Sequence, residues 1–246
     1  MPVMSNAPVR QTVILAAGAG TRLGTAGDPK PLVTVGGIPL IGHALRHAHA
    51  SGCTEAIVVI GYEGQRVRAA IEGIGVPLAV RFVSNPDPDT PNGRSLLVAE
   101  SCAAGQFYLQ MVDHLFTAPV LPLLSAVPFD AHTDGRVLVD RAPVDLDVDD
   151  ATKVRLARDR VTAIGKSVEP WDAIDAGCFV LTHRVFDALR AVPGHEPLTV
   201  SSAMRQLAAS GALAATELAG IGWIDVDTPA DRDRAERRVA AYSART

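Results

Sequence analysis

The residues best suited to chemistry lie in the segment 13–30, VILAAGAGTRLGTAGDPK. Gly18 and Gly20 follow a short apolar run and leave backbone N–H groups unshielded, a pattern typical of a loop that binds phosphate oxygens. Arg22 adds a planar guanidinium that can bind a phosphate at two points, and Lys30, between two prolines, adds a point charge. We therefore expect this segment to bind an anion.

Two common phosphate-binding loops are excluded by the residues around these glycines. A Walker loop requires Gly-Lys followed by Ser or Thr, and segment 13–30 contains no such triplet. A dinucleotide-binding fingerprint requires a glycine where Leu23 stands. The segment can still be a phosphate-binding loop of another class. The alternative is that it is a glycine-rich turn that only connects two secondary-structure elements.

Two acidic segments predict a metal site. Asp113 lies where the strand predicted over 106–111 ends, and Asp225 and Asp227 lie two apart in WIDVDTP. Mg²⁺ prefers oxygen ligands and is usually held by one or two carboxylates together with substrate phosphates. We expect Asp113 and Asp227 to bind Mg²⁺, with Asp225 as the alternative because residues two apart on a strand share a face. Asp227 could also simply cap the helix that the following proline opens.

Polar residues in two further segments are candidates for binding substrates. Asn92, Gly93 and Ser95, in NGRSLL, could contact the edge of a base, although Asn92 could equally cap a helix. Lys166 and Asp175 lie in the middle of the chain, where a phosphorylated second substrate would need a cation.

Other polar clusters receive no functional assignment. We expect the acidic run 145–150 to be a solvated loop. His43 and His47 lie four apart on a predicted helix without a third metal ligand, so a solvated helix face is the favoured interpretation.

Alternating apolar runs and amphipathic segments indicate an α/β fold with a mostly parallel sheet and helices on both faces. Ligands of such sheets bind beyond the carboxyl ends of the strands, where segment 17–20 and Asp113 both fall. The middle of the chain has the pattern of a small antiparallel insertion that would hold the second substrate. The predicted helices are 40–50, 65–71, 94–104, 184–191, 200–209 and 230–242, and the predicted strands after the first are 56–60, 78–83, 106–111, 137–140, 152–157, 161–164, 174–181, 214–218 and 221–226.

Composition limits the class of protein. The 246 residues predict a short flexible N-terminal tail, 1–10, and a single domain, 11–246. A net charge of −4 argues against nucleic acid as a partner. We expect no membrane insertion, because no apolar segment is long enough, and a cytoplasmic location, because the N-terminus lacks the apolar core of a signal peptide. Three widely spaced cysteines indicate reduced thiols. The oligomeric state stays open, a dimer being one of the states that the sequence allows.

Taken together, the motifs resemble the nucleotidyltransferases that join a nucleoside triphosphate to a phosphorylated small molecule. The branch that they resemble is the CTP:inositol-1-phosphate cytidylyltransferases, whereas phosphonate and phosphocholine cytidylyltransferases are similar in the nucleotide half. Two features depart from that pattern: Val112 replaces a small residue, and the membrane domain that often follows is not part of this sequence. The resemblance covers residues 13–236 and rests on the phosphate loop, NGRSLL, VDH, DDATKVR, VTAIGK, WDAIDAGCFVL and WIDVDTP.

The resemblance implies a Rossmann-like fold of the nucleotide-diphospho-sugar transferase type and a Mg²⁺-dependent transfer of cytidylyl from CTP to a small acceptor, with inositol 1-phosphate favoured. Alternative acceptors are 2-hydroxyethylphosphonate, 2-aminoethylphosphonate, phosphocholine and other cyclitol phosphates, and the alternative from another class is a nucleotide-binding regulator without catalysis. Arg22, Lys30 and Lys166 would be catalytic, and Lys166 and Asp175 would bind the acceptor. The nucleotide would contact Leu15, Ala16, Ala17, Gly18, Gly20, Thr21, Arg22, Lys30, Asn92, Gly93 and Ser95.

Overall fold

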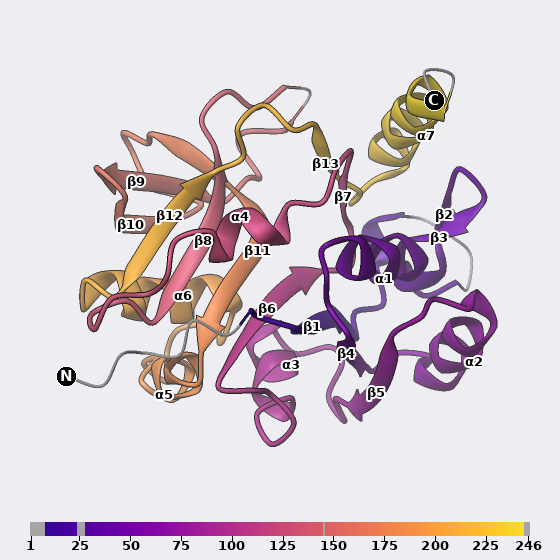
Figure 1. Cartoon of the computed structure of the whole chain (residues 1–246), viewed down its shortest axis with the longest axis horizontal. Helices are drawn as coiled ribbons and strands as arrows, with labels where there is room; N and C mark the ends of the chain where they lie inside the picture. Colours follow the sequence, from indigo (N-terminus) through magenta and orange to yellow (C-terminus); the bar gives the residue numbers. More distant parts are fainter. Residues whose placement is uncertain (1–7, 24–27, 145, 244–246) are drawn as a thin grey trace.

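The computed structural model describes residues 8–23, 28–144 and 146–243. A nine-stranded mixed sheet runs through the molecule in the order β5-β4-β1-β6-β11-β8-β12-β10-β9 (Figure 1). Its first half is parallel and its second half is mainly antiparallel, so β6 and β11 at the centre join two different kinds of sheet. The candidate functional side chains lie beyond the ends of these central strands.

The parallel half is formed by four strands, of which the three inner ones are mainly buried and the edge strand is partly exposed. It comprises β1 (Gln11–Ala16), β4 (Glu55–Ile60), β5 (Ala79–Ser84) and β6 (Gln106–Met111), and every residue of β1 is buried. Alternate residues of β1 pack into different hydrophobic clusters, Val13 on one face and Ile14 on the other. Such a fully apolar strand requires cover on both sides.

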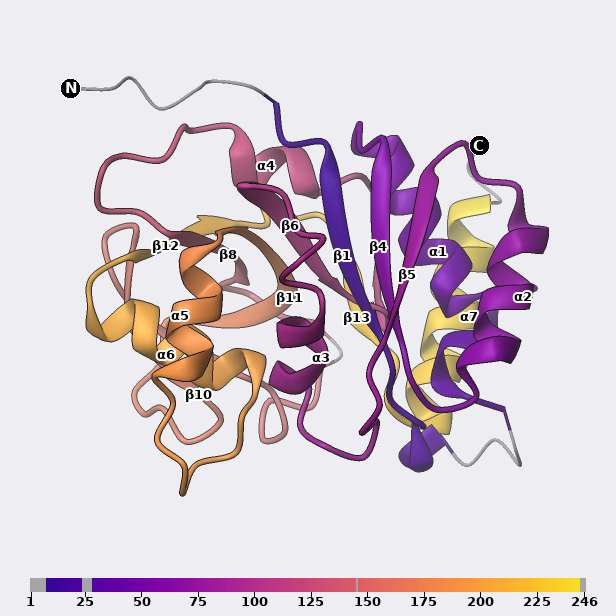
Figure 2. The ribbon, with the colours of Figure 1, turned by 90° about the horizontal axis from the view of Figure 1, so that it is seen from below.

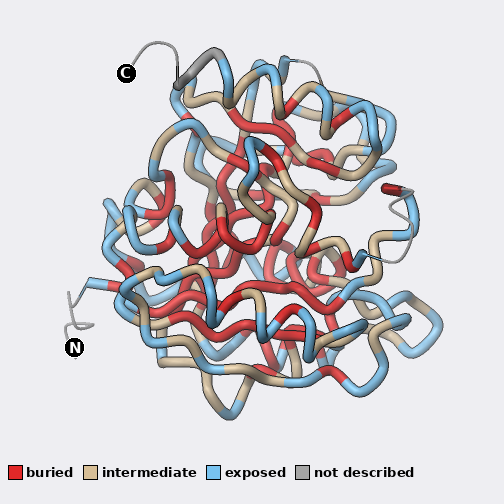
Figure 3. The backbone as a smooth tube through the Cα atoms, turned by 90° about the vertical axis from the view of Figure 1, so that its right-hand side faces the viewer, coloured by how far each residue is buried: buried red, intermediate tan, exposed pale blue. Residues whose placement is uncertain are grey.

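The helices supply that cover, as Figure 2 shows. One face carries α1 (Leu40–Ala50) and α2 (Gly64–Ile74), and α7 (Pro229–Ser243) lies on the same side. The other carries α3 (Gly93–Val98), α5 (Arg184–Arg190) and α6 (Val200–Ala209). Buried backbone accordingly runs through the middle of the molecule, with exposed segments around it (Figure 3).

The second half of the sheet contains the strands predicted for the middle of the chain, and these strands extend the main sheet directly. They are β8 (Gly135–Asp140), β9 (Lys153–Ala157), β10 (Arg160–Gly165), β11 (Ala173–Thr182) and β12 (Leu213–Glu217). All of their pairings are antiparallel except β8–β12, which is parallel. Because β9 also pairs with the start of β11, the five strands curl into a closed circuit of pairings.

Short elements complete the fold and shape the end of the sheet that carries the site. The pair β7 (His114–Phe116) and β13 (Trp223–Asp225) is antiparallel and brings the two predicted acidic segments side by side. The sequence predicts no strand at β7, because three residues carry no visible alternation. The remaining short elements are η1 (Thr21–Leu23), η2 (Lys30–Leu32), β2 (Thr34–Val35), β3 (Ile38–Pro39) and α4 (Leu121–Ser125).

Two local predictions are wrong. The helix predicted over 94–104 ends at Val98, because the residues after it form mostly three-residue turns, such as the bond from Cys102 N–H to Ala99 O. His43 and His47 do not form a solvated face: His43 bonds the carbonyl of Val35, and the pKa of each ring is lowered by burial.

The ends and the cysteines add three observations. Val9, within the predicted tail, is buried against the core, whereas residues 1–7 lie outside the described part. Cys53, Cys102 and Cys178 are free thiols, as predicted. None of the helices in the described part is both long and apolar enough to span a membrane.

Candidate active site

Residues 17–20 follow the carboxyl end of β1, and Gly20 packs against the side chain of Lys30. Gly20 has a φ of +69°, and a Cβ there would overlap the side chain of Lys30, so only glycine fits without displacing the lysine. Arg22 extends from the short η1 helix with a side chain that is 60% exposed. The loop therefore places one exposed and one buried cation at the same end of the sheet.

Lys30 lies on the floor of the site, where its side chain is only 12% exposed. Pro29 is extended and Pro31 is the second residue of η2, so the backbone around Lys30 has little freedom. The ammonium group donates to the carboxylates of both Asp113 and Asp227. Burial alone would lower the pKa of Lys30, but these carboxylates raise it above its ordinary value. Lys30 is therefore a permanent cation held between the two carboxylates that the sequence predicts to bind a metal.

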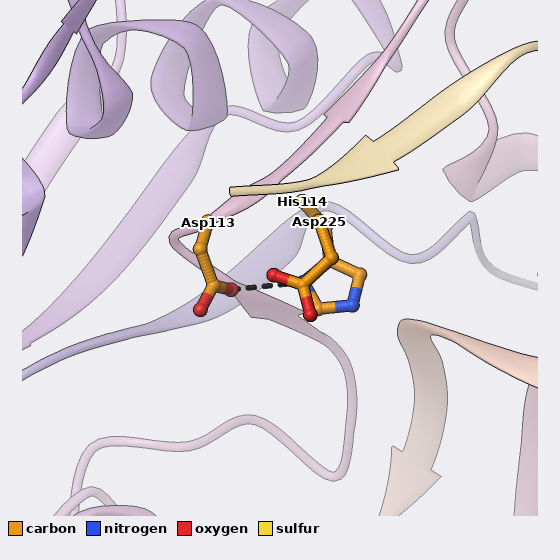
Figure 4. Close-up of side chains that lie close together, drawn as sticks. All are labelled: Asp113, His114 and Asp225. Carbon is orange, nitrogen blue, oxygen red and sulfur yellow. Dashed lines mark hydrogen bonds and ion pairs between the residues drawn. The ribbon is translucent and has the colours of Figure 1, made fainter. Parts of the chain in front are cut away.

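His114 links Asp113 to Asp225 (Figure 4). Its Nδ1 lies 2.8 Å from Asp113 Oδ1 and 4.0 Å from Asp225 Oδ1, and its ring stacks on Trp223 with centroids 5.5 Å apart. Burial would lower the pKa of His114, yet Asp225 and Asp113 raise it to about 9. Burial and the neighbouring carboxylate of Asp113 raise the pKa of Asp225 to about 7.

The donor atoms of Asp113, His114 and Asp225 all lie within 4.8 Å of one another, which makes them a candidate metal-binding cluster. Asp225 Oδ1 is buried and has no hydrogen-bond partner within the described residues. A bound cation would satisfy this oxygen. A protonated imidazole, however, has no lone pair for a metal. The hard oxygen donors that suit Mg²⁺ here are thus the carboxylates, and Asp227 adds a third.

Charged side chains form an alternating chain along the wall of the site. Each member contacts the next, and positive and negative groups alternate throughout. The cations along this wall are therefore paired with the protein's own carboxylates. In order, the chain consists of Lys166, Asp150, Arg22, Asp227, Lys30, Asp113, His114 and Asp225.

This chain lines a cavity of about 730 Å³, large enough for a nucleotide and a small second molecule. The cavity brings together seven of the sequence-predicted site residues from segments far apart in the chain. They are Arg22, Lys30, Asn92, Asp113, Lys166, Asp175 and Asp227.

The other residues predicted to bind the nucleotide are not among the described residues that line the cavity. Leu15, Ala16 and Ala17 are buried at the end of β1, and Gly18, Gly20 and Thr21 follow them. The Ser95 hydroxyl is buried and accepts a hydrogen bond from Asn85 at 3.0 Å. Contacts between these residues and a nucleotide stay predictions.

Asn92 and Gly93 have structural contacts at the start of α3. The Asn92 side chain accepts a hydrogen bond from the backbone N–H of Val200 at 2.9 Å. A Cβ at Gly93 would overlap the carbonyl of Leu198. These contacts tie α3 to α6, so Asn92 has a structural role whether or not it also contacts a base.

Asp175 and Lys166 face the cavity from the second half of the sheet. Asp175 Oδ1 accepts a hydrogen bond from the backbone N–H of Gly177 at 2.8 Å, and burial raises the pKa of Asp175 to about 6. Lys166 follows β10 and donates to Asp150 from an exposed position. The cavity therefore has a buried carboxylate and an exposed cation on its second side.

The sequence reasoning missed two contributors to the site. Asp150 lies in the acidic run predicted to be a solvated loop, but its carboxylate binds both Arg22 and Lys166. His114 stands next to Asp113 and was given no role, although a histidine that directly follows a predicted metal ligand is a signal in itself. The acidic run carried no comparable signal, because charge runs are usually solvated.

Comparison with known proteins gives consistent results. Residues 12–144 match the family described as MobA-like NTP transferase domain. A protein of Rubrobacter xylanophilus named bifunctional IPC transferase and DIPP synthase is 37% identical over 94% of this chain. The CMP-5'-(3-aminopropyl)phosphonate synthase of Streptomyces rubellomurinus is 31% identical over 94% of this chain.

These relatives are longer proteins. The chain spans 52% of the Rubrobacter protein and 39% of the Streptomyces protein. The solved structure of the inositol-1-phosphate CTP transferase from T. maritima shares the fold, with a TM-score of 0.82 at 22% identity over 91% of each chain. The family match covers more than half of the residues, and the chain therefore belongs to the nucleotidyltransferases with a MobA-like NTP transferase domain.

Proposed function

We propose that this protein is a metal-dependent cytidylyltransferase that joins CTP to a small phosphorylated acceptor, with inositol 1-phosphate favoured, and releases pyrophosphate. The observation that carries the proposal is the buried Lys30 ammonium between Asp113 and Asp227 at the floor of a cavity that also contains Arg22 and Lys166. This arrangement provides cations for two phosphorylated substrates and carboxylates for a metal.

The reaction needs alignment and charge neutralisation more than proton transfer. A phosphomonoester has a second pKa near 6, so its oxygen is already a nucleophile at neutral pH. That oxygen attacks the α-phosphorus of CTP, the bond from the α-phosphorus to the oxygen bridging to the β-phosphate breaks, and pyrophosphate leaves. Lys30 would stabilise the charge that develops at the α-phosphate, Arg22 and the loop amides would hold the other phosphates, and Lys166 would orient the acceptor.

The carboxylates fit a divalent metal. Asp113 and Asp227 would hold Mg²⁺, with Asp225 as the alternative second ligand. The carboxylates of Asp113 and Asp227 already face the same positive charge, which is the Lys30 ammonium group. When bound, Mg²⁺ would neutralise negative charge on the phosphates.

Two observations support the choice of substrates. Asn92, the residue that we propose to contact the base, lines the same cavity as Arg22 and Lys30. Relatives named IPC transferase and CMP-5'-(3-aminopropyl)phosphonate synthase are similar to this chain over nearly its whole length, which supports cytidine and leaves a phosphonate as the alternative acceptor class.

The test measures pyrophosphate release with Mg²⁺, crossing the four ribonucleoside triphosphates with inositol 1-phosphate, phosphocholine and the two phosphonates. We expect release with CTP and inositol 1-phosphate. Pyrophosphate release only with CTP and a phosphonate would change the assigned acceptor from inositol 1-phosphate to that phosphonate. Release only with another nucleotide would reject the assignment as a cytidylyltransferase.

A substitution pair tests the role of Lys30. Lys30→Met should lower kcat by at least about 100-fold, because one buried charge contact to a transition state contributes a factor of this size. Lys153→Met is the matched control, since Lys153 is also buried and ion-paired, to Glu169, but does not line the described cavity. Near-normal turnover of a folded Lys30→Met protein would refute the role.

A further inference from the structure

Asp150 connects cations from the two sides of the cavity. Its Oδ2 accepts a hydrogen bond from Arg22 Nη1 at 2.9 Å, and its Oδ1 accepts one from Lys166 Nζ. Arg22 belongs to the phosphate loop, whereas Lys166 follows β10 in the other half of the sheet. A single carboxylate therefore contacts both the cation proposed to bind the nucleotide and the cation proposed to bind the acceptor.

The loop around Asp150 is held by its own hydrogen bonds. Asp147 accepts the N–H of Asp149 on its side chain and the N–H of Ala151 on its carbonyl, both at 3.1 Å. Asp147 thus fixes the backbone on both sides of Asp150. The Asp150 side chain is nevertheless 47% exposed, so a ligand in the cavity can reach the position of its carboxylate.

Resting on the function proposed above, we propose that the Asp150 carboxylate occupies the place of the acceptor's phosphoryl group in the unliganded protein and is displaced by it. Of the anionic groups in the two substrates, the attacking phosphate is the one that the function proposed above assigns to Lys166, and it must lie next to the nucleotide phosphates that Arg22 would hold. Arg22 and Lys166 meet at the Asp150 carboxylate and mark that point.

Displacement makes Asp150 a specificity-determining residue. At neutral pH a phosphomonoester carries nearly two negative charges and three acceptor oxygens, whereas a carboxylate carries one charge and two oxygens. A dianionic acceptor therefore displaces Asp150 from Arg22 and Lys166, while a monoanion only competes with it on equal terms. Lys166 should be affected most, because Arg22 retains Asp227 as a second partner.

The experiment measures the binding of inorganic phosphate by isothermal titration calorimetry, with formate as a monoanionic probe, to the whole protein. Asp150→Asn should bind phosphate about two- to tenfold more tightly, the range that two exposed ion pairs carry, and formate should gain at least as much. Asp149→Asn is the matched control and should bind as the wild type does, because it is a neighbouring exposed carboxylate that lies outside the described cavity lining.

A second substitution isolates the contribution of Lys166. In a Lys166→Met background, the gain produced by Asp150→Asn should shrink, because one of the two released cations is gone. Equal or weaker phosphate binding by Asp150→Asn, in a protein whose far-ultraviolet circular dichroism is unchanged, would overturn the proposal.

Kinetics separate this proposal from the proposed function. Asp150→Asn should lower the KM of the acceptor more than that of the nucleotide, which a merely structural loop residue would not do. Phosphate binding needs no turnover. An absence of pyrophosphate release with every substrate pair would therefore reject the activity alone, whereas normal activity without a gain in phosphate binding would reject the role of Asp150 alone.

Discussion

Gly177→Ala should disturb the site through a single added methyl group. Gly177 has a φ of +72°, and a Cβ there would lie 2.5 Å from Nε2 of His114 and overlap the ring carbons. Ordinary contacts of carbon atoms are 3.5–4.0 Å long, so the ring must move by about 1 Å. That movement weakens the stacking of His114 on Trp223 and its 2.8 Å contact with Asp113.

The expected loss of stability follows from these contacts. A left-handed alanine costs about 1–2 kcal/mol, the aromatic pair contributes about 0.5–1.5 kcal/mol, and a hydrogen bond to a charged group contributes about 1.5–3 kcal/mol. Gly177→Ala should therefore lower the free energy of unfolding by about 3–6 kcal/mol. It should also lower kcat, because Asp113 loses the partner that orients it.

Gly211→Ala is the matched control. Gly211 has the same φ of +72°, but a Cβ there would meet no atom within 4 Å. It should lose only the backbone contribution, about 1–2 kcal/mol, and keep wild-type turnover. Urea unfolding measures the stabilities and pyrophosphate release the activities. If the two variants lost the same stability, or if a folded Gly177→Ala protein kept full turnover, the role assigned to the position of His114 would be refuted.

Two further predictions concern the core and the metal. His47→Phe should lower the free energy of unfolding by about 2–4 kcal/mol, because the side-chain oxygen of Gln110 and the backbone N–H of Val120 lose their hydrogen bonds to the ring, whereas the exposed His49→Phe should change it little. Since burial lowers the pKa of His47, the unfolded chain binds more protons, so wild-type stability should fall as the pH drops below about 6.5, and His47→Phe should lose part of that slope in urea unfolding at several pH values. Chelation with EDTA should abolish pyrophosphate release and added Mg²⁺ should restore it. Asp227→Asn should raise the Mg²⁺ concentration needed for half-maximal rate more than Asp225→Asn does, and the reverse order would make Asp225 the second ligand.

Local sequence patterns were sufficient for the elements that position the site. The bounds of α1, α6 and β6 agree with the predicted ranges, because each has a strong apolar period and a clear boundary. The position of Asp113 at the same edge of the sheet as segment 17–20 also followed from the sequence, since the carboxyl ends of neighbouring parallel strands share one edge.

Contacts between the two halves of the sheet could not be predicted in the same way. Gly177 leaves room for His114 only because β11 passes the end of β6, and no local pattern specifies that approach. The sequence pattern predicts His47 to be an exposed helix residue, yet its ring accepts a hydrogen bond from the backbone N–H of Val120, in the loop between β7 and α4. Such polar contacts depend on tertiary packing, and a helical period contains no information about them.

The alternating chain of charges gives a physical reason for a metal requirement. Each cation of the site already contacts a carboxylate, so the cavity offers little surplus positive charge to a nucleoside triphosphate. Displacing Asp150 would free part of Arg22 and Lys166 for the phosphates of the substrates. Asp113, Asp225 and Asp227 would still repel those phosphates from the floor of the site, where Lys30 and His114 neutralise part of their charge. A divalent cation held by these carboxylates would reverse that repulsion, so the same residues would help to hold the substrate that they would otherwise exclude.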